Sequence, residues 1–382
     1  MEQEGFLWIE SRREEYLSFL RRLVCTESHS FDRAGVIGAG RVVEDFVRGK
    51  GFSVVRQSFA RAGDGMLILS PGKEAMAPVC FVAHLDTVFP AGTFPDRLKE
   101  ENGFLHGPGV VDCKGGIAVA LLAMEALRKV GCPRSLRLLL TPDEEVSNRL
   151  SGMEGIRWIQ DNSRGCAAAF VCECGTQGEA VTQRKGVLKA QVIIRGKSVH
   201  AGMFYDQGAS AIREAAYKIL QLEEHSEAGG ITYNCGKIAG GEAENRVPDH
   251  CSFSVDIRFC TEEEKARAIE HLEQTVRQCR VPGTSALWRT LSLRSPMPRS
   301  EEGMSLFARL QRTGERYGLE RLRSCFNGGG SDAAYTVAAG VPTVCGLGAT
   351  GFDWHSPRER MDKNSLTERA KLLAATIADW NN

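Results

Sequence analysis

The sequence has 382 residues, of which 42% are hydrophobic and 25% are charged. This length suits two domains, and the composition is that of a globular protein. Lys plus Arg and Asp plus Glu number 48 each, so the formal net charge is zero and nothing favours a polyanion-binding surface. We therefore expect no nucleic-acid partner.

The N-terminus and the hydropathy pattern bear on location. Residues 1–5 are acidic and polar, without the basic start and apolar run of a secretory signal. No stretch approaches the ~20 apolar residues needed to span a bilayer. We therefore expect a soluble, cytoplasmic protein without a membrane partner.

The thirteen cysteines are scattered along the chain, without the dense spacing of a disulfide scaffold. Without an export signal, we expect most of them to be buried free thiols. Cys172 and Cys174 flank Glu173, so a thiolate metal site is an alternative there. Because alternate residues of a strand face the same side, we expect both cysteines to point away from Glu173 into a core.

In the first half of the chain, strand-like and helix-like segments alternate. Residues 9–24 have helical apolar spacing, and residues 79–83 form a continuous apolar run typical of a buried strand. A helix is predicted over 116–130, ended by a glycine and a proline, and buried strands over 136–140 and 167–172. Strand, helix and strand in this order predict a parallel sheet covered by helices.

Beyond residue 186 the pattern changes to an alternation of apolar and polar residues, which indicates antiparallel strands with one solvated face. The elements predicted here form a small α+β sandwich: strands over 187–195, 250–259 and 287–293, and amphipathic helices over 209–222 and 262–278.

A proline- and serine-rich linker at 295–300 precedes a return of the first pattern. A buried strand is predicted over 341–345 and a closing helix over 365–380. The expected fold class is therefore α/β. A discontinuous catalytic domain (1–185 and 296–382) with a mainly parallel sheet between helices contains an inserted α+β domain (186–295).

Acidic and imidazole side chains follow the predicted strands. His84 and Asp86 follow one strand, Glu144 and Glu145 the next, and Glu173 a third, while Asp112 precedes a helix and His355 lies in a late loop. Each feature alone has an ordinary explanation, such as a helix cap or a solvated surface group. Because open α/β sheets gather ligands at the carboxyl ends of their strands, we expect these groups to meet at one edge. So many buried charges need cations, and imidazole mixed with carboxylate suits zinc.

Six ordered motifs carry a family resemblance. They are His84-Leu85-Asp86-Thr87-Val88, Gly109-Val110-Val111-Asp112-Cys113-Lys114-Gly115-Gly116, Thr141-Pro142-Asp143-Glu144-Glu145, Val199-His200-Ala201-Gly202, Gly328-Gly329-Gly330-Ser331-Asp332-Ala333 and His355-Ser356. From about residue 10 to its end, the chain resembles the clan MH zinc exopeptidases and deacylases. These include glutamate carboxypeptidase, acetylornithine deacetylase, succinyl-diaminopimelate desuccinylase and aminoacylase. Asp332-Ala333-Ala334-Tyr335 and Gly351-Phe352 are most similar to the bacterial glutamate carboxypeptidase type.

The resemblance implies a site with two Zn²⁺ ions per chain, for which Co²⁺ or Mn²⁺ can substitute. Asp112 would bridge both ions, with His84 and Glu173 completing one site and Glu145 and His355 the other.

The resemblance also gives roles to residues that are not metal ligands. Asp86 would orient the ring of His84, and Glu144 would be the general base and acid. The sequence departs from the family at Cys113, where Met is usual, and at Cys174, where Pro is common. Glu173, where some branches have Asp, points to carboxypeptidase or deacylase action.

In the inserted domain, His200, Asn245 and Arg258 match family positions that meet the substrate. The backbone of Gly328, Gly329 and Gly330 could offer N–H groups to the same carboxylate. The resemblance implies a homodimer through this domain, with His200 reaching the partner's active site. The residues flanking 185 and 296 are predicted to be a hinge pair.

The expected substrate is a small peptide or an N-acyl amino acid with a free α-carboxylate, whose side chain is acidic if the glutamate carboxypeptidase resemblance holds. An aminoacylase or deacetylase is the alternative within enzymes, because the site chemistry is the same. A non-catalytic binding protein of this fold is a further alternative, which the complete set of ligands and Glu144 disfavours. Gly330-Ser331-Asp332 lacks the Gly-x-Ser-x-Gly pattern of a serine hydrolase.

Overall fold

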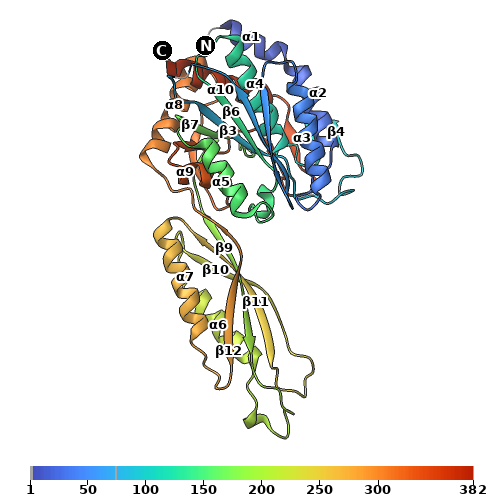
Figure 1. Ribbon diagram of the computed structural model, residues 1–382, viewed down its shortest axis with the longest axis vertical. Coiled ribbons are helices and arrows are strands. Elements are labelled where there is room, and N and C mark those ends of the chain that lie inside the picture. Colours follow the sequence, from blue (N-terminus) through green and yellow to red (C-terminus); the bar gives the residue numbers. More distant parts are fainter. Residues whose placement is uncertain (1–2, 74, 382) are drawn as a thin grey trace. The chain divides into compact units, whose positions relative to one another are not determined.

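The computed structural model describes residues 3–73 and 75–381 (Figure 1). The chain divides into two units. The first consists of Met1–Gln183, Arg299–Phe326 and Ser331–Asn382, and the second of Arg184–Pro298 and Asn327–Gly330.

The first unit is built on a mixed sheet with the strand order β1-β2-β6-β3-β7-β14. Its strands are β1 (Ser53–Phe59), β2 (Gly63–Ser70), β3 (Val79–His84), β6 (Leu136–Thr141), β7 (Ala168–Val171) and β14 (Thr343–Val344). β6, β3, β7 and β14 run parallel, and β1 and β2 add an antiparallel edge. The prediction of a mainly parallel sheet is confirmed, and every residue of β3 is buried, as its apolar run indicated.

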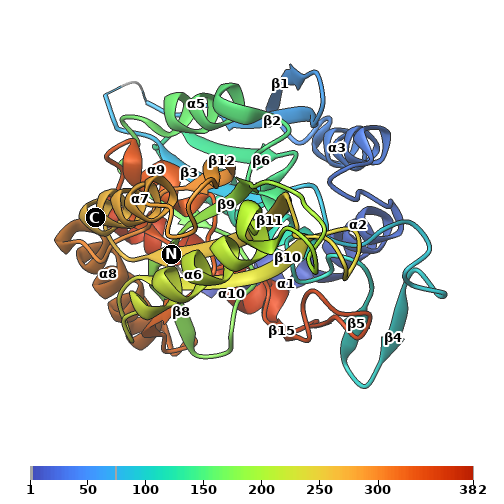
Figure 2. The same ribbon diagram turned by 90° about the horizontal axis from the view of Figure 1, so that it is seen from below.

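Helices cover both faces of this sheet. α1 (Gln3–Ser11), α2 (Arg13–Cys25), α4 (Lys114–Lys129) and α10 (Ser365–Ala378) pack on one another, while α5 (Gly152–Ser163) and α9 (Ala333–Ala338) form another group. Figure 2 shows α5 on one side of the sheet and α1 and α10 on the other. α3 (Arg33–Val47) packs on β2, and α8 (Glu301–Tyr317) on β14 and α10. The helix predicted over 9–24 is two helices, with Arg12 between them.

Two small sheets that we did not predict complete the unit. β4 (Lys99–Glu101), β5 (Phe104–His106), β15 (Gly351–Phe352) and β16 (Arg360–Asp362) form a sheet of order β15-β16-β5-β4. β8 (Glu179–Arg184) pairs with β13 (Arg323–Asn327). The first of these sheets matters for the site, because His355 lies in the loop between β15 and β16.

The second unit is an antiparallel sheet of order β10-β11-β9-β12 with two helices. Its elements are β9 (Gly186–Arg195), α6 (Ala211–Glu224), β10 (Thr232–Gly240), β11 (His250–Phe259), α7 (Glu262–Arg277) and β12 (Ser285–Arg294). The alternation predicted in β9 is present: Leu188, Ala190, Val192 and Ile194 are buried in the core with both helices. Ser210 and Thr261 cap α6 and α7, each accepting a backbone N–H in the first turn.

The placement of the glycine segment differs from the domain range expected for it. Residues 327–330 fall within the range 296–382, yet they belong to the second unit. The physical reason is a set of hydrogen bonds to the backbone carbonyls of this segment. The N–H of Lys185 donates to the carbonyl of Asn327 (3.2 Å), and the Arg184 guanidinium donates to the carbonyls of Gly329 (3.3 Å) and Gly330 (3.4 Å).

A buried ion pair stabilises the second unit. Glu214 and Lys218, one turn apart on α6, are 0% and 1% exposed and lie 3.0 Å apart. The Glu214 carboxylate accepts the backbone N–H groups of Arg280 (2.9 Å) and Val281 (2.7 Å). Lys218 donates to carbonyls at the end of α7, including that of Thr275 (2.7 Å). The pair therefore joins α6 to the chain that follows α7.

Among the described residues, no helix has both the length and the apolar character needed to cross a membrane. All thirteen cysteines are free thiols, and seven of them are buried.

Candidate metal centre

The site lies at the carboxyl ends of three neighbouring strands. In the order β6-β3-β7, His84 is the last residue of β3, and Glu173 follows closely after β7. A short 3-10 helix, Glu144–Val146, follows β6. Because these strands are parallel, their ends place the three segments side by side. Asp112 comes directly before Cys113, the N-cap of α4.

Asp112 stands between two imidazoles. Its Oδ1 lies 3.1 Å from Nε2 of His84, and its Oδ2 lies 3.1 Å from Nε2 of His355. A second carboxylate approaches each ring: Glu173 Oε2 is 3.7 Å from His84 Nε2, and Glu145 Oε2 is 3.1 Å from His355 Nε2. The structure thus brings together all five residues expected to bind metal, as two sets that share Asp112.

Burial dominates the electrostatics of the acidic groups. Burial, with the charge of Asp112 nearby, raises the pKa of Glu145 well above its usual range. Burial and the charge of Glu144 likewise raise the pKa of Glu173. Burial also acts to raise the pKa of Asp112, but hydrogen bonds from His355 and His84 outweigh it and lower that pKa. Several carboxylates thus share one site, and only nearby cations can keep them all ionised.

Both histidines respond to these carboxylates. Hydrogen bonds to Asp112 and Glu145 raise the pKa of His355 to about 11. Burial acts to lower the pKa of His84, yet Cys113 and the neighbouring carboxylates raise it well above its ordinary value. In addition, Oε1 of Glu145 is buried without a hydrogen-bond partner. Imidazole nitrogens, a shared carboxylate and an unsatisfied carboxylate oxygen fit a divalent metal centre of the zinc type.

Asp86 organises the segment that follows β6. Its carboxylate accepts the backbone N–H of Glu144 (3.0 Å) and of Glu145 (3.2 Å), and the hydroxyl of Ser30 (2.6 Å). Nδ1 of His84 lies 2.9 Å from the Asp86 carbonyl and 3.3 Å from its Oδ1. One buried side chain therefore contacts the His84 ring and also fixes the backbone of Glu144 and Glu145.

The sequence reasoning missed Glu359. Its side chain is fully buried and accepts backbone N–H groups from the segment that carries Asp112. The motif His355-Ser356 ends before it, and its contact with Val111 spans 248 residues. No local pattern indicates a partner so distant in the sequence.

Two thiols also lie among the ligand atoms. Cys113 Sγ is within 4.8 Å of ligand atoms of His84 and Glu173, and Cys174 Sγ is within 4.8 Å of those of Asp112 and Glu173. Cys172 is buried, as expected, but the expectation that Cys174 points away from the carboxylates is wrong. The chain leaves β7 at Val171, so strand alternation does not extend to Cys174.

The remaining predicted site residues belong to the second unit. His200 pairs with Arg246 across an isolated bridge, and the N–H of Ala201 donates to the carbonyl of Asn245 (2.9 Å), so the loops of His200 and Asn245 lie together. Arg258, near the end of β11, makes a two-point contact with Asp256 (2.5 and 3.0 Å).

The glycine segment contacts Arg258. The guanidinium of Arg258 donates to the carbonyl of Gly328 (3.3 Å). The N–H of Gly329, which we expected to be available to a substrate, donates to Oδ1 of Asn327 (2.7 Å).

His200 and Arg258 lie at opposite ends of the second unit's sheet. The loops of His200 and Asn245 adjoin the start of β11, where Val247 and Asp249 bond to the chain beyond β9. Arg258 lies eight residues beyond His250, and at ~3.3 Å per residue this separation is ~26 Å. A small substrate cannot contact both ends of one such sheet.

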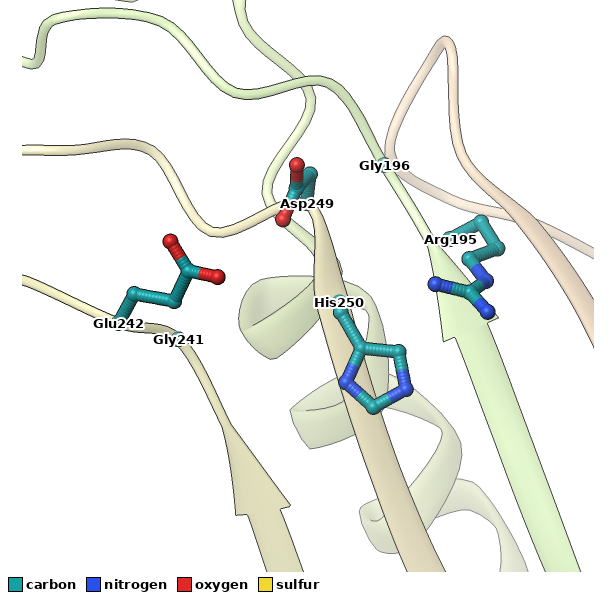
Figure 3. Close-up of a pocket in the computed structure, with 6 residues that line it drawn as sticks. All are labelled: Arg195, Gly196, Gly241, Glu242, Asp249 and His250. Atoms are coloured by element: carbon teal, nitrogen blue, oxygen red, sulfur yellow. The ribbon is translucent and has the colours of Figure 1, made fainter.

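A recess of about 670 Å³ lies at the His200 end of this sheet (Figure 3). Its lining residues are Arg195, Gly196, Gly241, Glu242, Asp249 and His250. Arg195 and His250 are paired on neighbouring strands. Basic and acidic groups of similar number line the recess, so its charge favours no particular ligand.

Comparison with known proteins agrees with this geometry. Residues 80–379 match the model of peptidase family M20/M25/M40. The chain belongs to this family. Carboxypeptidase G2 of Pseudomonas sp. (strain RS-16) is 27% identical over 374 residues, which cover 94% of this chain and 88% of that protein. Acetylornithine deacetylase of Myxococcus xanthus is 33% identical over 247 residues, or 60% of this chain and 63% of that one.

The solved structure of aminopeptidase PepT from Bacillus cereus ATCC 10987 superposes with a TM-score of 0.80 at 23% identity, covering 97% of this chain and 99% of that one. At this identity the likeness concerns the fold alone. As a member of the M20/M25/M40 family, the protein is a hydrolytic enzyme of the metallopeptidase type. The family resemblance drawn from the six motifs is therefore confirmed.

Proposed function

We propose that the protein is a two-metal hydrolase that uses zinc and cleaves the amide bond of an amino acid carrying a free α-carboxylate. The observation that carries the proposal is Asp112, whose two oxygens each lie 3.1 Å from a different imidazole. A carboxylate shared in this way suits a bridge between two metal ions. The expected action is that of a carboxypeptidase, with glutamate as the proposed released residue.

In this proposal, each residue of the site has a separate role. His84 and Glu173 would hold one ion, Glu145 and His355 would hold the other, and Asp112 would be a ligand of both. A bound metal pair supplies an acidified water and stabilises the charge that develops on the scissile carbonyl oxygen. Glu144 takes the proton of the attacking water and delivers it to the departing nitrogen.

Arg258 and the backbone N–H groups of Gly328 and Gly330 would bind the substrate's α-carboxylate, whereas the N–H of Gly329 donates to Asn327. The Arg258 guanidinium contacts the Asp256 carboxylate at two points, and the substrate's α-carboxylate would take the place of Asp256 in this contact. The test compares an N-acyl-glutamate with its α-amide, and then with N-acyl-leucine and N-acyl-lysine. Equal turnover of the acid and the α-amide would remove Arg258 from the substrate site. Faster turnover of leucine would overturn only the acidic side-chain preference.

A second candidate is an N-acyl amino acid deacylase, in which the acyl group is small. The identity of 33% with an acetylornithine deacetylase favours it. The two candidate functions are distinguished by the rates at which purified protein hydrolyses N-acetyl amino acids and dipeptides with the same C-terminal residue. A preference for the dipeptides supports the carboxypeptidase, and a preference for the acetyl series supports the deacylase.

We further propose that the enzyme is a homodimer in which His200 and Asn245 complete the partner's active site. Arg258 lies ~26 Å along β11 from His250, and the His200 loop adjoins the His250 end of that strand. This supports the proposal, because one chain cannot bring both His200 and Arg258 to the same small substrate. His200 would then donate to the developing oxyanion. Mixing inactive His200→Ala with inactive Glu144→Gln protein should restore part of the activity if subunits exchange. Heterodimers without activity would place His200 in its own chain's site.

The proposed dimer surface consists of the outer face of α6 and the edge of β10. Ile212, Ala216 and Leu220 are exposed at four-residue intervals on α6, and β10, an outer strand on which α6 packs, exposes Ile238. The exposed face of α7 is instead mostly charged. Leu220→Asp should therefore yield monomers in light scattering, whereas the control Arg277→Asp on α7 should not. Dimeric Leu220→Asp together with monomeric Arg277→Asp would move the interface to α7.

A further inference from the structure

Glu359 binds the backbone of the loop that presents Asp112. One of its oxygens, Oε1, accepts the N–H groups of Val111 (2.8 Å) and Asp112 (3.1 Å). The other, Oε2, accepts the N–H of Gly109 (3.2 Å). In return, the backbone carbonyl of Glu359 accepts the N–H of Gly107 (3.3 Å). A single buried carboxylate thus satisfies three donors within four consecutive residues.

The loop is confined on its other sides as well. Gly109 has φ +70°, and a Cβ there would lie 2.5 Å from the Thr87 side chain, so only glycine fits. The carbonyl of Gly109 accepts the N–H of Lys114 (2.9 Å) at the start of α4. Glu359 itself directly precedes β16, which pairs with β5. The loop is held at the start of α4, and Glu359 is held next to β16. The hydrogen bonds between Glu359 and the loop therefore determine where the Asp112 side chain points.

We propose that Glu359 is a positioning residue of the metal centre, which holds the loop so that the two oxygens of Asp112 face different imidazoles. The inference rests on the proposed metal-dependent function. The Glu359 carboxylate accepts hydrogen bonds from the backbone N–H groups of Gly109, Val111 and Asp112, so it acts on the metal centre through this loop. Its role parallels that of Asp86, which holds the backbone of Glu144 and Glu145.

The variant Glu359→Gln tests the proposal with little change of volume. A Gln carbonyl at the Oε1 position still accepts the N–H groups of Val111 and Asp112. The NH₂ group of Gln then faces the N–H of Gly109, so the charge-assisted bond to Gly109 is replaced by a contact between two donors. We expect Zn²⁺ affinity, measured by competition with a chromogenic chelator, to fall ~10–100-fold. The visible absorption of the Co²⁺-loaded protein should change too, because it reports ligand geometry. Glu100→Gln, on β4 of the same small sheet, is the matched control and should leave both unchanged.

Thermal denaturation of the metal-free wild type and variant measures any general loss of stability. A Glu359→Gln protein with wild-type Zn²⁺ affinity and an unchanged Co²⁺ spectrum would overturn the proposal, even if it melts at a lower temperature. If that variant does not fold, Glu359→Asp, which keeps the charge but shortens the reach, should show the same two changes, and wild-type values would again overturn it. Wild-type protein that binds no metal would defeat the proposed function itself, which is a distinguishable result.

Discussion

Replacing Asp86 with asparagine tests how the site positions its proton carrier. The Asp86 carboxylate accepts two backbone N–H groups, from Glu144 and Glu145, and one hydroxyl, from Ser30. An asparagine has one acceptor oxygen and one NH₂ group. The oxygen keeps one of the two backbone hydrogen bonds, but the NH₂ group faces the other backbone N–H, and two donors cannot bond to each other. Losing one hydrogen bond to a charged group costs about 1.5–3 kcal/mol, or roughly 10–150-fold in an equilibrium or a rate.

We therefore expect Asp86→Asn to lower kcat and metal affinity, each by ~10–100-fold, and to change KM much less. The assay is steady-state hydrolysis of an N-acyl amino acid with excess Zn²⁺, beside chelator competition for the affinity. Ser30→Ala is the control. This substitution removes a neutral hydrogen-bond donor and leaves both backbone bonds in place. It should therefore change the free energies derived from kcat and from metal affinity by about 1 kcal/mol or less. An Asp86→Asn enzyme within about threefold of wild type in both kcat and metal affinity would show that Asp86 does not position the metal centre.

The proton carrier, the metal ligands and the buried ion pair of the second unit can each be tested separately. Glu144→Gln should retain its metals but lose at least ~100-fold in turnover, whereas Glu145→Gln should also lose metal; the reverse pattern would exchange their roles. Because the pKa of His355 is raised to about 11, its ring is protonated at neutral pH without metal. Metal must displace that proton, so chelator competition should show affinity that tightens with rising pH, and a flat profile would contradict this. Glu214→Ala leaves Lys218 buried and two N–H groups without an acceptor, so urea denaturation should show a loss of ~3–5 kcal/mol. A loss below about 1 kcal/mol would show that the pair is unimportant.

Local hydrophobic patterns in the sequence were sufficient to predict individual strands. The apolar run of β3 and the alternation of β9 depend only on neighbouring residues, and both strands formed where expected. The ends of the parallel strands then explain why His84 and Glu173 lie together. β15 and β16 were missed because two or three residues carry no usable periodicity, and their pairing depends on distant β5.

The contacts that fix the site are long-range, which is why the sequence did not reveal them. Glu359 and Val111 are 248 positions apart, and Ser30 and Asp86 are 56 apart. A buried carboxylate bound to backbone N–H groups leaves no periodic signature, because the residues it contacts contribute no side chain. The assignment of Asn327 to the second unit has the same origin, in backbone bonds between distant segments.

Anomalous diffraction from crystals of the zinc-loaded protein would show whether two metal ions share Asp112. We expect two peaks ~3.5–4 Å apart, one on each side of the Asp112 carboxylate, each near one imidazole. Their other protein ligands should be His84 with Glu173 and His355 with Glu145. A single peak, or peaks that do not share Asp112, would contradict the two-metal mechanism.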